Sequence, residues 1–271
     1  MKALSRTYMW VIFALLYAPI LVLVVFSFNA GGTLSSFTGF SFRWYGELFR
    51  DSVALQSLKN SLFLALASSA IATVIATFAA LGLDRMRNRY LRATITSATN
   101  IPMMNPDIVT GVSMMLLFVA LGGVLGLSNA LGRWTMLIAH VTFTLPYVLL
   151  SVLPRFQQFD NTLREAAMDL GCTPTASFFK VELPAILPGI ISGFVMGFTL
   201  SLDDFVISHF VSSPDFQTLP LYIYNQTAHN VKYSMYALCT LIIVTILVLL
   251  LAVNFAGGIG DRNKKRREVK K

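Results

Sequence analysis

Six long apolar segments alternate with shorter polar segments along the chain. Each apolar segment reaches the roughly 20 residues that a helix needs to cross the hydrocarbon core of a bilayer. They cover residues 9–28, 61–83, 95–121, 134–153, 185–207 and 235–256. The pattern predicts an all-α membrane protein with six transmembrane helices. No repeat or low-complexity segment separates them, so we expect one transmembrane domain over residues 1–271.

Prolines interrupt several of these predicted spans, at Pro19, Pro102, Pro106 and Pro146. A proline within a helix removes one backbone donor and bends the helix. Neighbouring helices in a membrane bundle can satisfy the backbone groups that the bend frees. We therefore expect bent helices at these positions.

The composition supports a membrane location. Hydrophobic residues make up 55% of the chain and charged residues 13%, whereas a soluble domain carries about a quarter charged residues. The formal net charge of +8 would also fit a nucleic-acid-binding protein. However, the basic residues lie between the apolar segments, where anionic lipid attracts Lys and Arg. We expect contact with membrane lipid and no nucleic-acid partner.

The distribution of Lys and Arg predicts the orientation of the chain. Basic residues concentrate in the N-terminus, in loops 84–100 and 154–184, and in the tail 257–271. Loops 29–60, 122–133 and 208–234 carry few. Because segments rich in Lys and Arg remain on the cytoplasmic side, we expect both termini to be cytoplasmic. The tail is then a basic cytoplasmic anchor.

The cytoplasmic loop 154–184 carries the signals of two short helices. Thr162 and Glu165 have the spacing of a capping box, so a first helix is expected from there to Leu170. Gly171 suits the left-handed conformation that ends a helix. Connections in helical bundles usually have only a few residues, so a folded loop of this length is unusual.

The second helix of this loop is predicted to begin with Thr173 as its N-cap and Pro174 at its first position. We expect it to run to about Glu182 and to stop near Pro184. Ala166 and Ala167 keep one surface of the first helix small, so that surface can enter a cleft on another protein. The alternative is a solvated connector.

The loop also resembles a known motif. Its sequence Glu165-Ala-Ala-Met-Asp-Leu-Gly171, followed by Phe178-Phe-Lys-Val-Glu-Leu-Pro184, is similar to the EAA loop of ABC importer permeases. The resemblance implies a type I ABC importer permease bundle in the bacterial inner membrane. In that family the loop docks into an ATP-binding subunit and transmits its closure. The coupling residues implied here are Glu165, Ala166, Ala167, Gly171 and Pro184.

The same resemblance implies the partners of the chain. They are a second, homologous permease subunit, a dimer of ATP-binding subunits, and an extracytoplasmic substrate-binding protein that faces loops 29–60 and 208–234. The sequence contains no Gly-rich Walker motif. We therefore expect ATP and Mg to bind the partner ATPase, with no cofactor and no catalytic residue in this chain. The chain is predicted to be a transport subunit and not an enzyme.

Further strings extend the resemblance over essentially the whole chain. They are Asn105-Pro-Asp-Ile-Val109, His140-Val-Thr-Phe143, Ser201-Leu-Asp-Asp-Phe205 and Leu219-Pro-Leu-Tyr-Ile-Tyr224. They look like the permeases of spermidine/putrescine importers, in particular the C-type of the two membrane subunits. Related permeases for other solutes share parts of these strings. Polyamine import is the predicted function, and a permease for iron, thiamine or an anion is the alternative within the family.

Three acidic residues give the polyamine prediction a chemical basis. Asp107 lies near the middle of the third predicted span, and Asp203 and Asp204 lie toward the outer end of the fifth. A charged residue within a span is energetically costly and usually has a function. A polyamine is a chain of ammonium groups, so its path is expected to present carboxylates and aromatic faces. We predict that these acids line the substrate path.

Other placements of these acids remain open. Asp203 and Asp204 can lie hydrated at the outer interface, and Asp107 can cap a helix that restarts after Pro106. Adjacent helical positions are about 100° apart, so at most one of Asp203 and Asp204 can face a pore directly. Small residues recur in the fifth span and allow close helix approach, at Gly189, Gly193, Gly197, Ser201, Asp204 and Ser208.

The sequence gives little support for intramembrane proteolysis or for metal binding. An intramembrane aspartyl protease would pair Asp107 with Asp203 or Asp204, but the Gly-x-Gly-Asp string of that class is absent. The two cysteines and three histidines lack the spacing of a metal site. We expect no metal.

Overall fold

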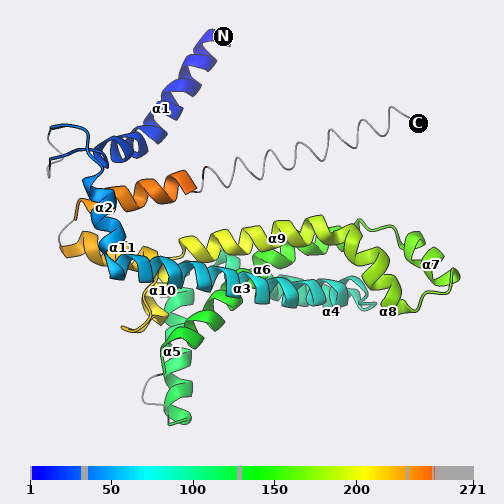
Figure 1. Ribbon diagram of the computed structural model, residues 1–271. Helices are drawn as coiled ribbons and strands as arrows, with labels where there is room; N and C mark the ends of the chain where they lie inside the picture. The colour runs from blue at the N-terminus through cyan, green and yellow to red at the C-terminus, as the bar shows by residue number, and fades with distance from the viewer. Residues whose placement is uncertain (1, 32–35, 127–129, 230–231, 246, 248–271) are drawn as a thin grey trace. The chain divides into compact units, whose positions relative to one another are not determined.

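The computed structural model describes residues 2–31, 36–126, 130–229, 232–245 and 247. These residues are mostly helical, with two isolated bridge pairs, Asn29–Phe40 and Ser213–Phe216. A π-helical segment, Phe178–Glu182, joins α8 to α9, and an apolar helix, Ser234–Thr245, follows α11. The labelled helices (Figure 1) are α1 (Lys2–Phe26), α2 (Arg43–Arg50), α3 (Ser52–Asp84), α4 (Arg89–Met104), α5 (Asp107–Val124), α6 (Arg133–Gln157), α7 (Asn161–Asp169), α8 (Pro174–Ser177), α9 (Leu183–Asp203), α10 (Val206–Val211) and α11 (Leu219–His229).

Five helices in the described part of the chain are long and apolar enough to cross a membrane. They are Arg6–Phe26, Ser52–Asp84, Asp107–Val124, Arg133–Gln157 and the continuous helix Pro174–Asp203. The prediction of an all-α membrane protein is thereby confirmed. Only the first part of the sixth predicted span, 235–256, is described, as the helix Ser234–Thr245. The number of spans and the cytoplasmic location of both termini stay predictions, and the basic tail 257–271 lies outside the described residues.

The chain divides into two compact units. One contains residues 56–224, and the other contains residues 1–55 with 225–271. The prediction of one transmembrane domain over the whole chain stays a prediction. The helix breaks and the cytoplasmic loop described below all belong to the unit 56–224.

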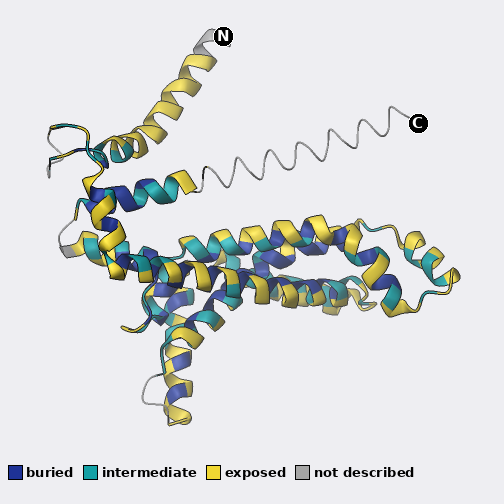
Figure 2. Cartoon of the chain, viewed as in Figure 1, coloured by how far each residue is buried: buried dark blue, intermediate teal, exposed yellow. Residues whose placement is uncertain are grey.

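Helix α6 forms the centre of the unit 56–224. Its C-terminal half packs Val148, Val152 and Phe156 against α3 and the start of α9. Its other half packs Met136 and Phe143 against residues of α3, α5 and α10. Figure 2 shows buried residues along the sides of α6 and α9 that face each other. The apolar side chains of α6 are therefore largely covered by its neighbours.

Small residues allow α9 to approach α6 closely. A β-carbon placed on Gly193 would lie 3.0 Å from one methyl carbon of Val148, and a β-carbon on Gly197 would lie 3.0 Å from the other. Any larger side chain would push the helices apart, which is why membrane interfaces favour small residues. The predicted close contact along this stripe is confirmed.

The outer faces of the same helices remain apolar and exposed. Phe63 and Phe78 on α3 and Ile191 on α9 are each more than half exposed. Contiguous exposed apolar surface of this kind marks contact with membrane or with another protein.

Trp44 is an internal anchor of the other unit. Its side chain is buried, and its indole N–H donates to the carbonyl oxygen of Asn29 over 2.7 Å. Its ring lies 5.2 Å from the ring of Tyr233. A buried indole needs a partner for its N–H, and the turn after α1 supplies one.

Candidate functional site

The first feature of the candidate site is a break between α4 and α5. Helix α4 ends at Met104, Asn105 is extended, and α5 begins at Asp107 directly after Pro106. A proline disfavours helical geometry in the residue before it and lacks an N–H, so the helix stops and restarts. The predicted continuous span 95–121 is wrong. Asp107 is exposed in the first turn of α5, a favourable position for an acid, and does not lie at the middle of a span.

The second feature is a break between α9 and α10. Helix α9 ends at Asp203, and Asp204 adopts an extended conformation. The Asp204 carboxylate accepts hydrogen bonds from the backbone N–H groups of Ile207 (3.2 Å) and Ser208 (2.8 Å). An aspartate side chain can thus satisfy backbone groups in place of a continuing helix. The predicted span 185–207 is wrong at this end.

These two breaks lie beside each other. A β-carbon placed on Gly111, one turn after Asp107, would lie 3.5 Å from the carbonyl oxygen of Val206 and 3.6 Å from Cα of Ile207. The first turns of α5 therefore pack directly on α10. The structure brings together segments that are about 100 residues apart in sequence, and each carries an acid that the sequence analysis selected.

A buried polar cluster fixes the second break to α6. The Nδ1 atom of His140 lies 2.8 Å from the Ser201 hydroxyl, and its Nε2 atom lies 3.1 Å from the Ser208 hydroxyl. Ser68 on α3 hydrogen-bonds Ser201 over 2.9 Å. His140 thus joins the end of α9 to α10. This role of His140 was not predicted from the sequence, although the stripe that contains Ser201, Asp204 and Ser208 was the available signal.

The three predicted path residues differ in exposure. Asp107 and Asp203 are exposed, whereas the side chain of Asp204 is 6% exposed. Asp204 lies against His140 and the N–H groups of α10. Two of the three acids can therefore meet a solute directly, and the third stabilises the break. Within the described residues, no group of three His, Cys, Asp or Glu side chains has the geometry to hold a metal ion.

The cytoplasmic loop begins with a different cap from the one predicted. The Asp160 carboxylate accepts from the N–H of Thr162 (3.0 Å) and from its hydroxyl (2.8 Å). The hydroxyl bond and then the backbone bond lower the pKa of the Asp160 carboxyl below its ordinary value. Helix α7 accordingly starts at Asn161, and the Thr162–Glu165 capping box is wrong. An aspartate is at least as good an N-cap as a threonine.

The end of α7 is as predicted. Gly171 has a φ of +92°. Its N–H bonds to the carbonyl of Met168, and the N–H of Cys172 bonds to the carbonyl of Ala167. These two bonds form a Schellman motif, which requires a left-handed residue at this position. The predicted turn at Gly171 is confirmed.

The second helix of the loop also begins as predicted but does not stop. Thr173 caps it through the N–H of Ala176 (3.3 Å), with Pro174 at the first turn. The helix then runs through the π-helical segment into α9 without a break. The N–H of Leu183 bonds to the carbonyl of Phe178, five residues back. This wider turn accommodates the ring of Pro184, so the predicted stop near Pro184 is wrong.

Most of the predicted coupling residues lie on the surface of the loop. Glu165, Ala166, Gly171 and Pro184 are exposed, and Ala167 is half-buried. Two apolar side chains of the same loop, Leu163 and Leu170, are 53% and 87% exposed. A single exposed leucine needs no explanation, but two on one short folded loop give it an apolar surface that can contact another protein.

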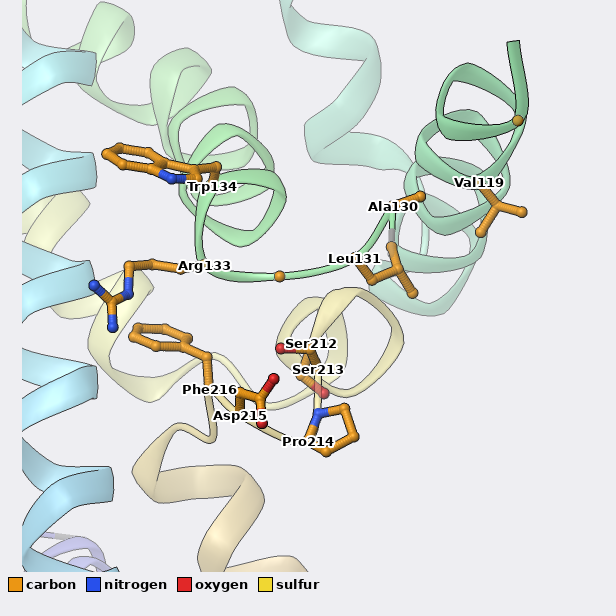
Figure 3. Close-up of a pocket in the computed structure, with 12 residues that line it drawn as sticks. Val119, Ala130, Leu131, Arg133, Trp134, Ser212, Ser213, Pro214, Asp215 and Phe216 are labelled. Carbon is orange, nitrogen blue, oxygen red and sulfur yellow. The ribbon is translucent and has the colours of Figure 1, made fainter. Parts of the chain in front are cut away.

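A cavity of about 910 Å³ lies between the end of α5, the start of α6 and the turn after α10 (Figure 3). The guanidinium of Arg133 lies over the ring of Phe216, 5.4 Å from its centroid. Asp215 lies in the same turn, so the lining carries both charges. The cavity belongs to segments predicted to face outward, and its mixed charge does not select a cation.

Comparison with known proteins defines the class of this chain. The family described as "Binding-protein-dependent transport system inner membrane component" matches residues 72–259. The chain belongs to this family. It is therefore an inner-membrane transport component of a system that depends on a binding protein, and it is not an enzyme.

The most informative curated relatives are permeases. The chain is 41% identical over 231 residues to the putrescine transport system permease protein PotI of Escherichia coli strain K12, covering 85% of this chain and 82% of PotI. It is 40% identical over 246 residues to the spermidine/putrescine transport system permease protein PotC of Haemophilus influenzae, covering 91% and 93%. The resemblance stated from the EAA loop and the further strings is confirmed.

Solved structures agree on the fold. The chain superimposes with a TM-score of 0.73 on a bacterial ABC transporter involved in the import of the acidic polysaccharide alginate, at 16% identity, covering 93% of this chain and 95% of the other. A bacterial alginate ABC transporter in complex with an alginate pentasaccharide-bound periplasmic protein gives a TM-score of 0.71, at 16% identity. At this identity the likeness concerns the fold, and it confirms the ABC importer permease bundle.

Proposed function

We propose that this chain is a permease subunit of an ATP-driven importer that moves polyamines such as spermidine and putrescine into the cell. Relatives at 40–41% identity are named for these solutes. The observation that carries the proposal is the presence of two exposed acids, Asp107 and Asp203, at neighbouring helix breaks. Helices α5 and α9, which bear them, contain no Lys or Arg.

The charge at the breaks suits a polycation. An ammonium group about 4 Å from a carboxylate gains roughly 4 kcal/mol at the effective dielectric constant of a protein surface. Two carboxylates on adjacent elements can hold successive ammonium groups of one polyamine. An anion at the same place would be repelled, and the described parts of α5 and α9 offer no basic side chain to compensate.

Aromatic rings lie beside the second break. The ring of Phe205 is 4.7 Å from the ring of Tyr224 and 5.4 Å from that of His209. Tyr224 is 47% exposed. Aromatic faces attract ammonium groups by cation–π interaction, and their edges accommodate the methylene chains between the charges. This composition matches an alternating charged and apolar solute.

The geometry also selects between the two adjacent acids. Asp204 is buried and already accepts two backbone hydrogen bonds, whereas Asp203 is exposed. We assign Asp203, with Asp107, to the substrate path. Asp204 shapes the path indirectly, because it defines where α9 ends and α10 begins.

The energy for import is proposed to come from partner subunits. Glu165, Ala166, Ala167, Gly171 and Pro184 belong to a loop that would dock on an ATP-binding subunit, which would hold ATP and Mg. A dimer of that subunit, a second permease and the binding protein would complete the importer. The exposed Leu163 and Leu170 support a protein contact at this loop.

Uptake by a complete importer tests the proposal. The chain would be expressed with its partner subunits in a bacterial strain that lacks its own polyamine importers, and entry of radiolabelled putrescine and spermidine would be measured. We expect saturable uptake that needs ATP and is inhibited by unlabelled polyamine. Uptake that responds instead to ferric iron, thiamine or a small anion would reassign the solute, and absence of ATP dependence would reject the importer.

A further inference from the structure

A buried acid lies at the base of the cytoplasmic loop. Glu182, the last residue of the π-helical segment, has a side chain that is only 3% exposed. Both of its carboxylate oxygens accept from Nη2 of Arg85, at 2.8 and 2.9 Å. Arg85 directly follows the last residue of α3. The pair therefore connects the loop to the cytoplasmic end of a different membrane helix, 97 residues away in sequence.

A second arginine approaches the same carboxylate from α7. The Nε atom of Arg164 lies 3.8 Å from Oε1 of Glu182. The hydroxyl of Ser177 is 3.5 Å from the carbonyl oxygen of Arg164, which is a long contact but one that also ties α7 to α8. Glu182 thus has cationic groups from both α3 and α7 beside it.

The packing of α7 explains why this position matters. Its main contacts with other elements in the described part of the chain are with α8 and the π-helical segment. Apart from its backbone link to α6, α7 therefore passes a force applied by a docked protein mainly to α8 and to the segment that carries Glu182. From there, one route continues along α9, which is continuous with the segment, and the other crosses the ion pair into α3.

Apolar packing around Glu182 helps to fix the geometry of the Glu182–Arg85 ion pair. Phe178 in the same segment is buried in an apolar cluster with Leu83 of α3, Phe156 of α6 and Ile186 of α9. A buried carboxylate is strongly disfavoured without a partner. Loss of the contact with Arg85 would therefore be costly, and this cost keeps Arg85 in place beside Glu182. The single nitrogen Nη2 of Arg85 donates to both carboxylate oxygens of Glu182. These two bonds restrict rotation of the carboxylate.

We propose that Glu182 and Arg85 form the joint through which movement of the cytoplasmic loop reaches α3, so that α3 and α9 move together when a partner ATPase closes. This inference rests on the coupling role proposed above for the loop. Glu182 is a positioning residue: it touches neither substrate nor nucleotide. Without the pair, the loop would still dock, but its movement would reach α3 only through the apolar packing of Phe178.

The test compares transport with ATP hydrolysis in the complete importer reconstituted into liposomes. The variants are Glu182→Gln, Arg85→Gln, the double variant, and the charge exchange Glu182→Arg with Arg85→Glu. The matched control is Arg89→Gln, which removes an exposed arginine close to Arg85 in sequence that lies over the ring of Tyr90, 5.4 Å from its centroid. Three quantities are measured: the amount of ATPase subunit that copurifies, the rate of ATP hydrolysis, and the polyamine taken up per ATP hydrolysed.

We expect both single variants to retain the ATPase and to hydrolyse ATP, while uptake per ATP falls about tenfold, which corresponds to roughly 1.4 kcal/mol. The double variant should be no worse than either single one, because both remove the same pair. The charge exchange should recover part of the uptake per ATP, and Arg89→Gln should match the native chain.

Unchanged uptake per ATP in both single variants would overturn the joint. If Arg85→Gln does not accumulate because it leaves the buried Glu182 carboxylate without Arg85, Glu182→Gln decides, since it removes the buried charge and leaves only Arg85, which is 42% exposed. A Gly171→Val variant separates this inference from the coupling role itself. If that variant loses transport while the pair variants behave normally, only the joint is wrong; if it also transports normally, the coupling role of the loop is wrong.

Discussion

The imidazole Nε2 of His140 lies 3.6 Å from a carboxylate oxygen of Asp204, in the interior of the unit 56–224. The two side chains are 1% and 6% exposed. Asp204 also accepts from two backbone N–H groups, so its carboxylate is part of the structure of the break between α9 and α10. This contact distinguishes Asp204 from its exposed neighbour Asp203.

Replacement of His140 should weaken the fold around this break. His140→Ala would leave the hydroxyls of Ser201 and Ser208 without their shared partner and would open a cavity. We expect a loss of about 2–4 kcal/mol in stability, measured as a lower unfolding temperature of the purified protein in detergent. Thr142→Ala on the exposed face of α6 is the control, since its hydroxyl bonds only within its own helix. Equal unfolding temperatures for both variants would contradict this role.

The turn at Gly171 should be sensitive to backbone strain alone. No atom lies within 4 Å of a β-carbon placed there, but φ is +92°. A β-branched residue in this region costs more than about 1 kcal/mol. Gly171→Val should therefore insert into the membrane in normal amount but lose transport and binding of the ATPase, as judged by copurification.

Asparagine provides the matched control at this position. It adopts left-handed geometry far more readily than valine does, so Gly171→Asn should retain much of the native activity. Equal loss in both variants would indicate a steric clash with a partner and would argue against strain as the cause.

Local signals account for what the sequence predicted correctly. The cap at Thr173, the left-handed Gly171 and the apolar lengths of the helices depend on residues close in sequence. The restart at Pro106 was also signalled locally, but the apolar run continues through it, and hydropathy alone therefore predicted one span. The continuation past Pro184 depends on a π-helical turn, for which the sequence has no simple pattern.

The features that the sequence did not predict depend on contacts between residues far apart in the chain. His140 meets Ser201 and Ser208 across 61 and 68 residues. Glu182 meets Arg85 across 97 residues. Such partners become visible only when the helices are packed, because nothing in the local sequence around Glu182 distinguishes a buried acid from a solvated one. Asp107, Asp203 and Asp204 were selected because a charge within a predicted span is costly. Only the structure distinguishes the exposed Asp107 and Asp203 from the buried side chain of Asp204.

The orientation of the chain can be tested at Cys172. It lies in loop 154–184, which is predicted to be cytoplasmic, is partly exposed, and follows Gly171 in the Schellman turn. In a Cys239→Ser background, a membrane-impermeant maleimide should fail to label Cys172 in intact cells and should label it in inverted membrane vesicles. Labelling in intact cells would reverse the orientation and would place the loop away from any cytoplasmic ATPase.

The acids at the two breaks provide the sharpest test of the substrate path. Asp→Asn preserves side-chain volume and removes the charge. Asp107→Asn and Asp203→Asn should each raise the polyamine concentration for half-maximal uptake by about tenfold, which corresponds to roughly 1.4 kcal/mol per lost attraction. Assembly with the partner subunits should remain normal, because both side chains are exposed. The measurement is concentration-dependent uptake of spermidine and putrescine.

Asp204→Asn is the internal comparison. Asparagine remains a good cap for α10, so the break should persist, but the contact with His140 changes. We expect lower thermal stability of the protein and a reduced maximal rate, with little change in the concentration for half-maximal uptake.

The Asp107 and Asp203 variants should also distinguish the two polyamines. Uptake of spermidine, with three ammonium groups, should fall more than uptake of putrescine, with two. Native uptake of both solutes in the Asp107→Asn, Asp203→Asn double variant would remove the electrostatic basis for a cationic solute.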